Sequence, residues 1–376
     1  MVLNTNDTNY RRCSLSVMDN IADPDITFDE NGISNYYYEY LEAEKQHVLK
    51  GEAGEKIYNQ IIAQIKADGR GKKYDCILGV SGGVDSTYLA YLAKQAGLRV
   101  LCVHFDNGWN SELAVKNIQN IVEKCGFDLY TYVIDWEEFK DIQLSYFKAN
   151  VIDIEAVTDI AIFSALDIIC NEKGIKHIID GRNVVTEATL PKAWYCKNTS
   201  NLRDIHKRFG AVKIKKYPIL GPIRSRLAAR FKSFESWPLL NYTLYDKKLA
   251  KEKIVSELNW RDYGGKHYES VFTRFYQGYI LPRKFMVDKR KAHLSNLIFS
   301  GQLTKDDALK ELSQPIYPKA VFEHDLYFVI KKLGYTKEEF DIYLNTPAVP
   351  HSDYKMSLSI FDEYSILKPF KTLFNK

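Results

Sequence analysis

Long apolar runs are missing from this sequence, since no window approaches the roughly 18 consecutive apolar residues that a membrane-spanning helix needs. Residues 1–12 also lack the basic stretch and apolar core of a secretory signal. A net charge of +4 is too small to indicate a nucleic-acid partner by itself. These absences predict a soluble, cytoplasmic protein without a membrane span and without a nucleic-acid partner.

Cysteine is scarce, and its pattern excludes a disulfide framework. The six cysteines lie far apart, and four of them fall inside apolar runs. We therefore predict buried free thiols instead of disulfides or metal ligands. The positions are Cys13, Cys76, Cys102, Cys125, Cys170 and Cys196.

Two common phosphate-binding motifs are absent as well. The chain has no Gly-x-x-x-x-Gly-Lys-Ser/Thr segment, and no strand is followed by the three spaced glycines of a dinucleotide fingerprint. No Cys/His/Glu constellation of the kind a glutaminase domain would carry stands out either.

The chain of 376 residues is long enough for two or three domains. Residues 1–70 are predicted to form an irregular leader and one polar helix over about 39–66. In residues 71–222 buried strands alternate with helices, which predicts an α/β domain with a parallel sheet and helices on both faces. Residues 223–376 predict a mainly helical second domain. The expected strands cover 74–80, 99–105, 129–134 and 176–180; the expected helices cover 84–96, 112–124, 136–149 and 158–173.

The loop Ser81-Gly-Gly-Val-Asp-Ser86 follows the first expected strand, after Val80, and opens the next helix. Gly82 and Gly83 let backbone amides approach a polyphosphate closely, and the helix start directs further amides at the same anion. Ser81 and Ser86 can donate hydrogen bonds, and Asp85 is expected to bind the Mg²⁺ that accompanies ATP. The alternative is a plain glycine turn in which Asp85 or Ser86 stabilises the helix start.

Two other loops are expected at the same sheet edge. The second strand ends in Val103-His-Phe-Asp-Asn-Gly-Trp109, which is either part of the site or a plain Asn-Gly turn. The strand ending at Asp180 leads into Gly181-Arg-Asn-Val-Val-Thr-Glu187. Asn183 could bond phosphate or substrate, while Glu187 could hold the metal or cap a helix.

These residues resemble the PP-loop ATP pyrophosphatases, whose members include GMP synthetase, NAD synthetase, argininosuccinate synthetase and tRNA-modifying ligases. The resemblance implies a fold like that of the adenine nucleotide alpha hydrolases and cleavage of ATP to AMP and pyrophosphate by attack of a substrate oxygen. It implies catalytic roles for Ser81, Asp85 and Glu187, with Mg²⁺ held by Asp85 and Glu187. The remaining ATP-binding candidates are Val80, Gly82, Gly83, Ser86, His104, Phe105, Asp106, Gly181 and Asn183, with adenosine expected beside the residues from His104 to Asp106.

Read together, longer stretches are similar to one branch, the N-acetyl sugar amidotransferases that make acetamidino sugars for bacterial surface polysaccharides such as O-antigen. The matching stretches include Asp23-Pro-Asp-Ile-Thr-Phe-Asp-Glu-Asn-Gly32, Tyr132-Val-Ile-Asp-Trp-Glu-Glu-Phe139, Thr186-Glu-Ala-Thr-Leu-Pro191, Trp260-Arg-Asp-Tyr-Gly-Gly-Lys-His-Tyr-Glu-Ser270 and Ser300-Gly-Gln302. The resemblance implies that the acetamido oxygen of a nucleotide-linked sugar attacks ATP and that ammonia then displaces AMP. It also implies two partners similar to the histidine-biosynthesis pair, a glutaminase and a cyclase-like subunit that channels ammonia.

The segment from Arg261 to His293 holds ten Lys, Arg or His residues against three acids, with aromatic residues between them. A solvated basic helix face would explain this count. The aromatic interleaving and the family resemblance favour a pocket for the diphosphate and sugar. The candidate substrate residues are Lys266, His267, Glu269, Arg274, Lys289, Arg290 and His293.

The sequence departs from that family at its amino-terminal zinc site, where two Cys pairs are usual. The four positions here are Cys13, Ser16, Ser34 and Tyr37, and one thiolate cannot hold a structural Zn²⁺. We expect no zinc, and packing by Phe28, Tyr36, Tyr37 and Tyr38 in its place. The departures leave two interpretations open, drift in a subfamily that replaced the metal with packing or a scaffold paralogue with altered or lost activity. A tRNA-modifying PP-loop ligase is a further alternative, against which the missing Cys pairs and the modest net charge weigh.

Overall fold

The computed structural model describes residues 9–219, 234–265, 268–317 and 319–356. Its centre is a five-stranded sheet in the order β3-β2-β1-β4-β5, in which all neighbouring strands are parallel. The strands are β1 (Cys76–Gly79), β2 (Val100–Asp106), β3 (Asp128–Val133), β4 (His177–Ile179) and β5 (Glu235–Trp237). The first four confirm the predicted strands and the predicted parallel sheet. The fifth lies in the region predicted to be helical, so the sheet takes an edge strand from beyond residue 222.

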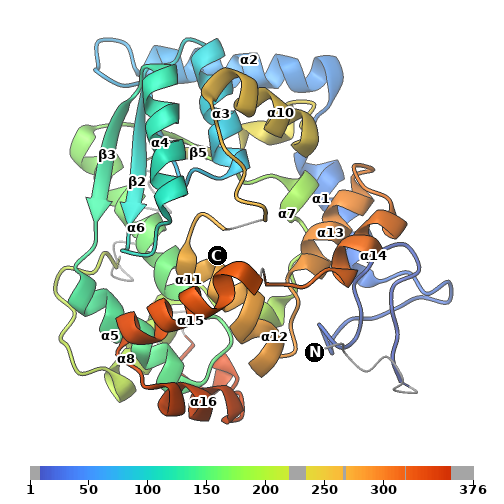
Figure 1. Cartoon of the computed structure of the whole chain (residues 1–376). Coiled ribbons are helices and arrows are strands. Elements are labelled where there is room, and N and C mark those ends of the chain that lie inside the picture. Colours follow the sequence, from blue (N-terminus) through green and yellow to red (C-terminus); the bar gives the residue numbers. More distant parts are fainter. Residues whose placement is uncertain (1–8, 220–233, 266–267, 318, 357–376) are drawn as a thin grey trace, which may run out of the picture.

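Each face of the sheet is buried by different helices because successive strand side chains point to opposite faces. On one face Cys76 and Leu78 pack with α2 (Gly51–Asp68), α3 (Val84–Gln95) and α4 (Glu112–Cys125). On the other face Ile77 packs with α6 (Ala156–Lys173). These helices come from the strand-to-strand crossovers and from the segment before β1, and Figure 1 shows them around the sheet.

In the view of Figure 1 the remaining helices lie below the carboxyl edge of the sheet or to its right, apart from α10 (Lys247–Leu258), which lies at the top beside α3. The largest buried cluster combines residues from the amino-terminal segment, from the middle of the chain and from the carboxyl-terminal region, with members as far apart as Met18 and Tyr354. The helices outside the sheet layers are α1 (Asn35–His47), α5 (Trp136–Ala149), α7 (Val184–Glu187), α8 (Thr199–Phe209), α10 (Lys247–Leu258), α11 (Val271–Phe275), α12 (Leu281–Lys284), α13 (Arg290–Phe299), α14 (Lys305–Ser313), α15 (Lys319–Leu333) and α16 (Lys337–Asn345). A π-helical turn, Tyr276–Ile280, joins α11 to α12.

The single helix predicted over residues 39–66 is wrong, because the structure has two helices there. Val48, after the end of α1, is extended (φ −106°, ψ 124°), and Leu49 N donates to Asn241 O at 3.0 Å. That bond to a distant segment replaces a helical one, which no local pattern of apolar residues reveals. The helix over 136–149 is confirmed as α5.

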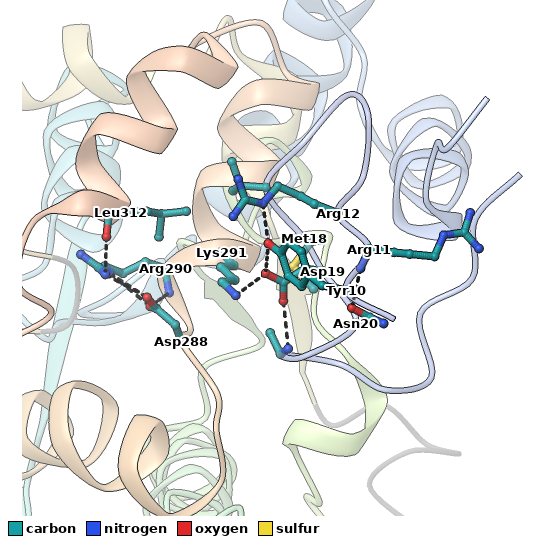
Figure 2. A network of polar contacts seen from close by, with 12 residues as sticks. Tyr10, Arg11, Arg12, Met18, Asp19, Asn20, Asp288, Arg290, Lys291 and Leu312 are labelled. Atoms are coloured by element: carbon teal, nitrogen blue, oxygen red, sulfur yellow. Dashed lines mark hydrogen bonds and ion pairs between the residues drawn. The ribbon is translucent and has the colours of Figure 1, made fainter. Parts of the chain in front are cut away.

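Polar contacts join the amino-terminal segment to α13, as Figure 2 shows. Asp19, 1% exposed, forms an ion pair with Lys291, which is also buried. The second acceptor oxygen of Asp19 is used too, since Ala22 N donates to it at 3.0 Å, and the Tyr10 hydroxyl donates to the carboxylate at 3.0 Å. A buried charge is tolerated when it is paired and hydrogen-bonded in this way.

Aromatic packing surrounds the positions where the resembled family has its Cys pairs. The Tyr37 and Tyr40 rings lie 5.4 and 5.6 Å from the Phe299 ring, between centroids. Cys13 Sγ accepts a hydrogen bond from Ser34 N at 3.3 Å. The other expected residues also make contacts: Tyr36 donates to Asp23, Tyr38 to Asp29, and the guanidinium of Arg11 lies over Phe28. The absence of zinc stays a prediction.

Candidate functional site

The loop of residues 80–83 joins the central strand β1 to α3 at the point where the strand order reverses. From β1 the chain moves to β2 and β3 on one side, then returns to β4 on the other side of β1. The crevice beyond the carboxyl ends of such strands is the usual ligand site in open α/β sheets. Gly82 has a φ of +81°, a left-handed conformation that favours glycine.

Hydroxyl groups gather inside this phosphate loop, by which we mean residues 80–86. Ser81 Oγ accepts a hydrogen bond from Gly83 N at 3.2 Å and lies 3.4 Å from Ser86 Oγ. Thr87 Oγ1 donates to Gly83 O at 2.7 Å and ties the loop to the first turn of α3. Ser81 is exposed, so the hydroxyls and the start of the helix face solvent together. This is the arrangement that an anion-binding helix start requires.

Two carboxylates lie near one buried phenol beside the loop. The Tyr245 hydroxyl donates to Asp85 Oδ1. Burial, then the charge and hydrogen bond of Asp85 and finally the charge of Glu187, raise the pKa of Tyr245 well above its usual value. The Tyr245 hydroxyl thus bonds Asp85, at the start of α3, and feels the charge of Glu187, at the end of α7. Two carboxylates together with substrate phosphates are a donor set that suits Mg²⁺.

The loop after β4 packs directly against the phosphate loop. A Cβ on Gly181 would lie 3.2 Å from the backbone carbon of Asp85 and 3.2 Å from Ser86 N, so only glycine fits without a shift. The Asn183 side chain makes hydrogen bonds within its own segment. Its Oδ1 accepts from Thr186 N at 2.9 Å as the cap of α7, and its Nδ2 donates to Gly181 O at 3.2 Å.

The loop after β2 lies on the other side of β1. His104 Nδ1 lies 3.2 Å from Val80 O, and its Nε2 lies 3.1 Å from Asn110 Nδ2. The Phe105 ring stacks on Tyr132 with centroids 5.6 Å apart. Asp106 Oδ1 accepts from Gly108 N at 2.9 Å, which shapes an Asn-Gly turn. His104 thus contacts both the phosphate loop and its own loop, whereas Asp106 bonds within its own loop.

The segment after α10 covers the phosphate loop from the opposite side. Trp260 Nε1 donates to Gly82 O at 2.7 Å, and the Tyr263 hydroxyl donates to the same oxygen at 3.0 Å. Asn117 of α4 fixes the segment, because its side chain donates to Arg261 O at 2.8 Å and accepts from Arg261 N at 2.9 Å. Trp260 is 2% exposed, so the contact is part of the protein interior.

Among the substrate candidates that the structure describes, Glu269 lies beside the phosphate loop. A Cβ built on Gly83 would be 3.5 Å from Glu269 Oε1, and Glu269 O accepts from Ser111 N at 2.9 Å. This carboxylate therefore faces the glycine turn from the carboxyl-terminal region. Lys266 and His267 fall outside the residues that the structure describes.

The other described substrate candidates contact several different segments. Arg274 Nε donates to Asp325 at 2.8 Å, and Arg290 pairs with Asp288 at 2.9 Å, as Figure 2 shows for Arg290. His293 Nε2 lies 3.1 Å from Lys247 Nζ. Lys289 Nζ lies 3.5 Å from Glu155, near the start of α6. Arg274 thus links α11 to α15, and Arg290 links α13 to α14 because it also donates to Leu312 O at 3.3 Å. Lys289 lies near a helix start that belongs to the sheet region.

A cationic group on the sheet side was missed by the sequence reasoning. Arg182 and Lys197 both lie over the ring of Phe163, at 5.9 and 5.4 Å from its centroid, and Phe163 is 47% exposed. Arg182 pairs with Asp180 at 2.9 Å and Lys197 with Asp159 at 2.9 Å. Because Arg182 follows Gly181, this group adjoins the phosphate loop.

Tyr245, Trp260 and Tyr263 were missed as well. Trp260 and Tyr263 stand within the matching stretch from Trp260 to Ser270, which marked the segment without giving either side chain a role. For Asn117 and Asn120 the sequence contains a weaker indication that they bond a distant segment. They are polar residues three apart on a helix face that is otherwise apolar, where a buried amide needs a distant partner.

Within the described part of the chain, no group of three or more His, Cys, Asp or Glu residues is placed to hold a metal. The same residues contain no helix long and apolar enough to cross a membrane. All six cysteines are free, and the prediction of buried thiols is confirmed for five of them, since Cys125 is only half-buried. Burial raises the pKa of Cys76, Cys102 and Cys170, in keeping with unreactive interior thiols.

Comparison with protein families assigns the two halves of the chain separately. Residues 75–218 match the family described as queuosine biosynthesis protein QueC. Residues 269–368 match the family described as LPS biosynthesis protein WbpG-like, C-terminal domain. The parallel sheet, the phosphate loop at its switch point and the first match define a member of the PP-loop family of ATP-utilising enzymes. The second match adds a WbpG-like carboxyl-terminal domain, in keeping with the resemblance to the N-acetyl sugar amidotransferases.

Curated relatives match different shares of the chain. An uncharacterized protein of Methanocaldococcus jannaschii, MJ1599, is 25% identical over 283 residues, which are 73% of this chain and 83% of that protein. A tRNA(Ile)-lysidine synthase of Thermus thermophilus is 26% identical over 164 residues, 43% of this chain and 30% of that enzyme. A 7-cyano-7-deazaguanine synthase of Campylobacter jejuni is 35% identical over 83 residues, 22% of this chain and 36% of that enzyme.

Among solved structures, NMN synthetase from Francisella tularensis is similar with a TM-score of 0.29 and 16% identity, over 47% of this chain and 71% of that one. A likeness this slight supports no argument. The fold assignment rests on the sheet itself.

Proposed function

We propose that this protein is an ATP-dependent amidotransferase that converts the acetamido group of a nucleotide-linked N-acetyl sugar into an acetamidino group. The acetamido oxygen attacks the α-phosphate of ATP, the bond to the β-phosphate breaks, and pyrophosphate leaves. Ammonia then adds to the activated carbon, and AMP leaves with the former acetamido oxygen. The observation that supports this most is a phosphate loop faced by Glu269, a residue of the WbpG-like region.

The residues of the site would act by positioning and by balancing charge, and no nucleophilic side chain is needed. Amides of residues 82–84 and the hydroxyls of Ser81 and Ser86 would bind the pyrophosphate part of ATP. Asp85 and Glu187 would hold Mg²⁺, which supplies positive charge against the phosphates when bound. This gives Ser81, Asp85 and Glu187 the catalytic roles.

The diphosphate of the sugar nucleotide needs cations outside the loop. Arg182, Lys197 and Lys289 supply them at the carboxyl edge of the sheet, and the exposed Phe163 ring offers a face for a sugar or base. Glu269 would orient the acetamido nitrogen or the incoming ammonia. Arg182 and Lys197 are also paired with carboxylates, but their side chains are 58% and 45% exposed. They therefore replace Arg274 and Arg290, whose side chains are only 16% and 23% exposed.

Ammonia would come from a separate glutaminase through a cyclase-like partner that channels it. The sequence offers no glutaminase constellation of its own, and the proposal assigns the product to surface polysaccharide biosynthesis, as in the description of the WbpG-like family.

Release of AMP and pyrophosphate, measured with a panel of N-acetylated nucleotide sugars and ammonia supplied directly, tests the proposal. We expect AMP formation that depends on both sugar and ammonia, together with a product in which NH replaces one oxygen, detectable by mass spectrometry. The Asp85→Asn variant should lose about 100-fold or more in turnover through loss of the metal. No sugar-dependent AMP with any member of the panel would count against the proposal and favour a scaffold.

A second candidate is adenylation of tRNA, because the curated relatives include a tRNA(Ile)-lysidine synthase. That match covers 43% of this chain and 30% of that enzyme, so it supports this candidate over less than half of the chain. The tRNA hypothesis requires RNA binding that is tight and that weakens as the salt concentration rises. Gel-shift titration with bulk tRNA separates the two: binding that survives physiological salt supports the second candidate.

A further inference from the structure

We infer that the segment from Tyr245 to Tyr263, here called the clamp, positions the phosphate loop for ATP, with Trp260 and Tyr263 as the positioning residues. This inference rests on the proposed function, because it presumes that the loop binds ATP. The clamp consists of α10 and its two flanks. Its residues lie outside the part of the chain that matches the QueC family, which ends at residue 218.

Both ends of the clamp contact the phosphate loop. Between them, α10 packs along α3, the helix that begins in the loop, as Figure 1 shows. Ile254 and Leu258 of α10 share an apolar cluster with Val84 and Tyr88 of α3. At one end of the clamp the Tyr245 hydroxyl donates to Asp85. At the other end, Trp260 and Tyr263 donate to Gly82 O at 2.7 and 3.0 Å.

The bonds to Gly82 O determine where the next amide points. A peptide unit is planar and trans, so the carbonyl of Gly82 and the N–H of Gly83 point in opposite directions. Because two donors hold the carbonyl toward the clamp, the Gly83 N–H is turned away from it, toward Ser81 Oγ. Glycines would otherwise let this peptide rotate easily, since neither residue has a Cβ. The clamp thus keeps one phosphate-binding amide in place before ATP arrives.

The clamp is itself held by both halves of the protein. From the sheet side, Asn117 bonds both backbone groups of Arg261, and Asn120 Nδ2 donates to Asn259 O at 2.8 Å. From the carboxyl-terminal side, Gln302 Nε2 donates to Tyr245 O at 2.9 Å and its Oε1 accepts from Lys247 N at 2.9 Å. The clamp therefore connects the ATP loop with the region that contains the sugar-site candidates.

Affinity for Mg·ATP and for AMP, measured by calorimetry on the full chain, tests the inference. Tyr263→Phe and Trp260→Phe each remove one donor and keep an aromatic ring. Each should weaken Mg·ATP binding about 5-fold, as expected for one hydrogen bond. The double variant should lose more than the product of the two, over about 25-fold, because the buried carbonyl is then without either donor. AMP lacks the phosphates that the loop holds, so its affinity should change less than about 2-fold.

Tyr91→Phe is the matched control, because Tyr91 packs in the same cluster and interacts with Lys253 instead of the loop. It should bind Mg·ATP like the unaltered chain. Unchanged Mg·ATP affinity in the double variant, or equal losses for ATP and AMP, would overturn the positioning role. If the double variant does not fold, Tyr263→Phe alone decides between these outcomes. Failure of the unaltered chain to bind Mg·ATP would overturn the proposed function as well, and so is distinguishable.

Discussion

Single residues set the close approach of the two loops at the switch point. Gly181 has no room for a Cβ, since it would lie 3.2 Å from atoms of both Asp85 and Ser86. We predict that Gly181→Ala pushes the start of α3 by a few tenths of an ångström and lowers turnover about tenfold, because small misplacements near reacting groups are costly. The measurement is AMP release at saturating substrate.

Gly79→Ala is the control for that change. Gly79 lies at the end of β1, and the nearest atom to its added Cβ, Leu166 Cδ1, is 4.0 Å away. This variant should keep its activity. Equal losses in both variants would show that tight packing at Gly181 is not the cause.

His351 illustrates how a buried residue gives a pH dependence. Its Nε2 accepts from Asp153 N at 3.3 Å, and its Nδ1 lies 2.8 Å from Asn201 Oδ1, so the neutral ring satisfies both neighbours. Burial lowers the pKa of His351 from 6.5 to about 4. The unfolded chain therefore binds the proton more readily, and this contribution to stability is present above pH 6.5 and is lost as the pH falls toward 4.

We predict that His351→Gln, which keeps a polar side chain, removes this dependence. The difference in unfolding free energy between the two proteins, from urea titrations at several pH values, should shrink as the pH falls from 6.5 to 4. Both proteins carry the same carboxylates, so the effect of carboxylate titration between pH 6.5 and 4 cancels in this difference. A difference that is constant over this range would contradict the prediction.

At the scale of elements, the helices of the carboxyl-terminal region are joined by buried ion pairs. Arg274 of α11 and Asp325 of α15 lie 2.6 Å apart, and Asp325 is 1% exposed. Removing one partner leaves a charge without compensation in the interior. We predict that Asp325→Ala lowers the unfolding free energy by about 3 kcal/mol, as measured by urea denaturation.

An exposed pair provides the comparison. Lys337 and Asp341 lie 2.7 Å apart on α16 with side chains 53% and 45% exposed. Asp341→Ala should cost less than about 0.5 kcal/mol because solvent screens such pairs. If Asp325→Ala lowers the unfolding free energy by no more than Asp341→Ala does, Arg274 must find another partner.

Elements of the sheet region were predictable because their signals are local. Buried strands such as Arg99 to Phe105 are short apolar runs between glycine turns, and each helix between them repeats apolar residues with the period of a helix. The break after His47 and the strand Glu235–Trp237 were not predictable. Both depend on pairing with distant backbone, at Asn241 and at β4 respectively.

At the scale of the whole molecule, the two halves share one interior. Phe139 and Phe147 of α5 are at most 1% exposed and belong to the same cluster as Phe272, Phe275 and Phe340 of the carboxyl-terminal region. A chain that ends at residue 219 would expose this apolar surface of α5. We predict that the truncated chain shows no cooperative thermal unfolding, since its core lacks one side.

Circular dichroism and calorimetry of residues 1–219 test this, with the full chain as reference. A cooperative transition near that of the full chain would show that the sheet region is stable alone. The boundary near residue 222 would then mark an independent folding unit, as the division into domains at 71–222 predicts.

The sequence by itself determined the parallel sheet, the phosphate loop and its neighbours at the sheet edge, because glycines, strand formers and helix periodicity act over a few residues. Only the tertiary structure decided that Tyr245, Trp260 and Tyr263 bind the loop and that Arg274 and Arg290 are occupied by Asp325 and Asp288. A cation or an aromatic ring can serve a ligand or a buried partner equally well. Which one it meets depends on how distant segments pack.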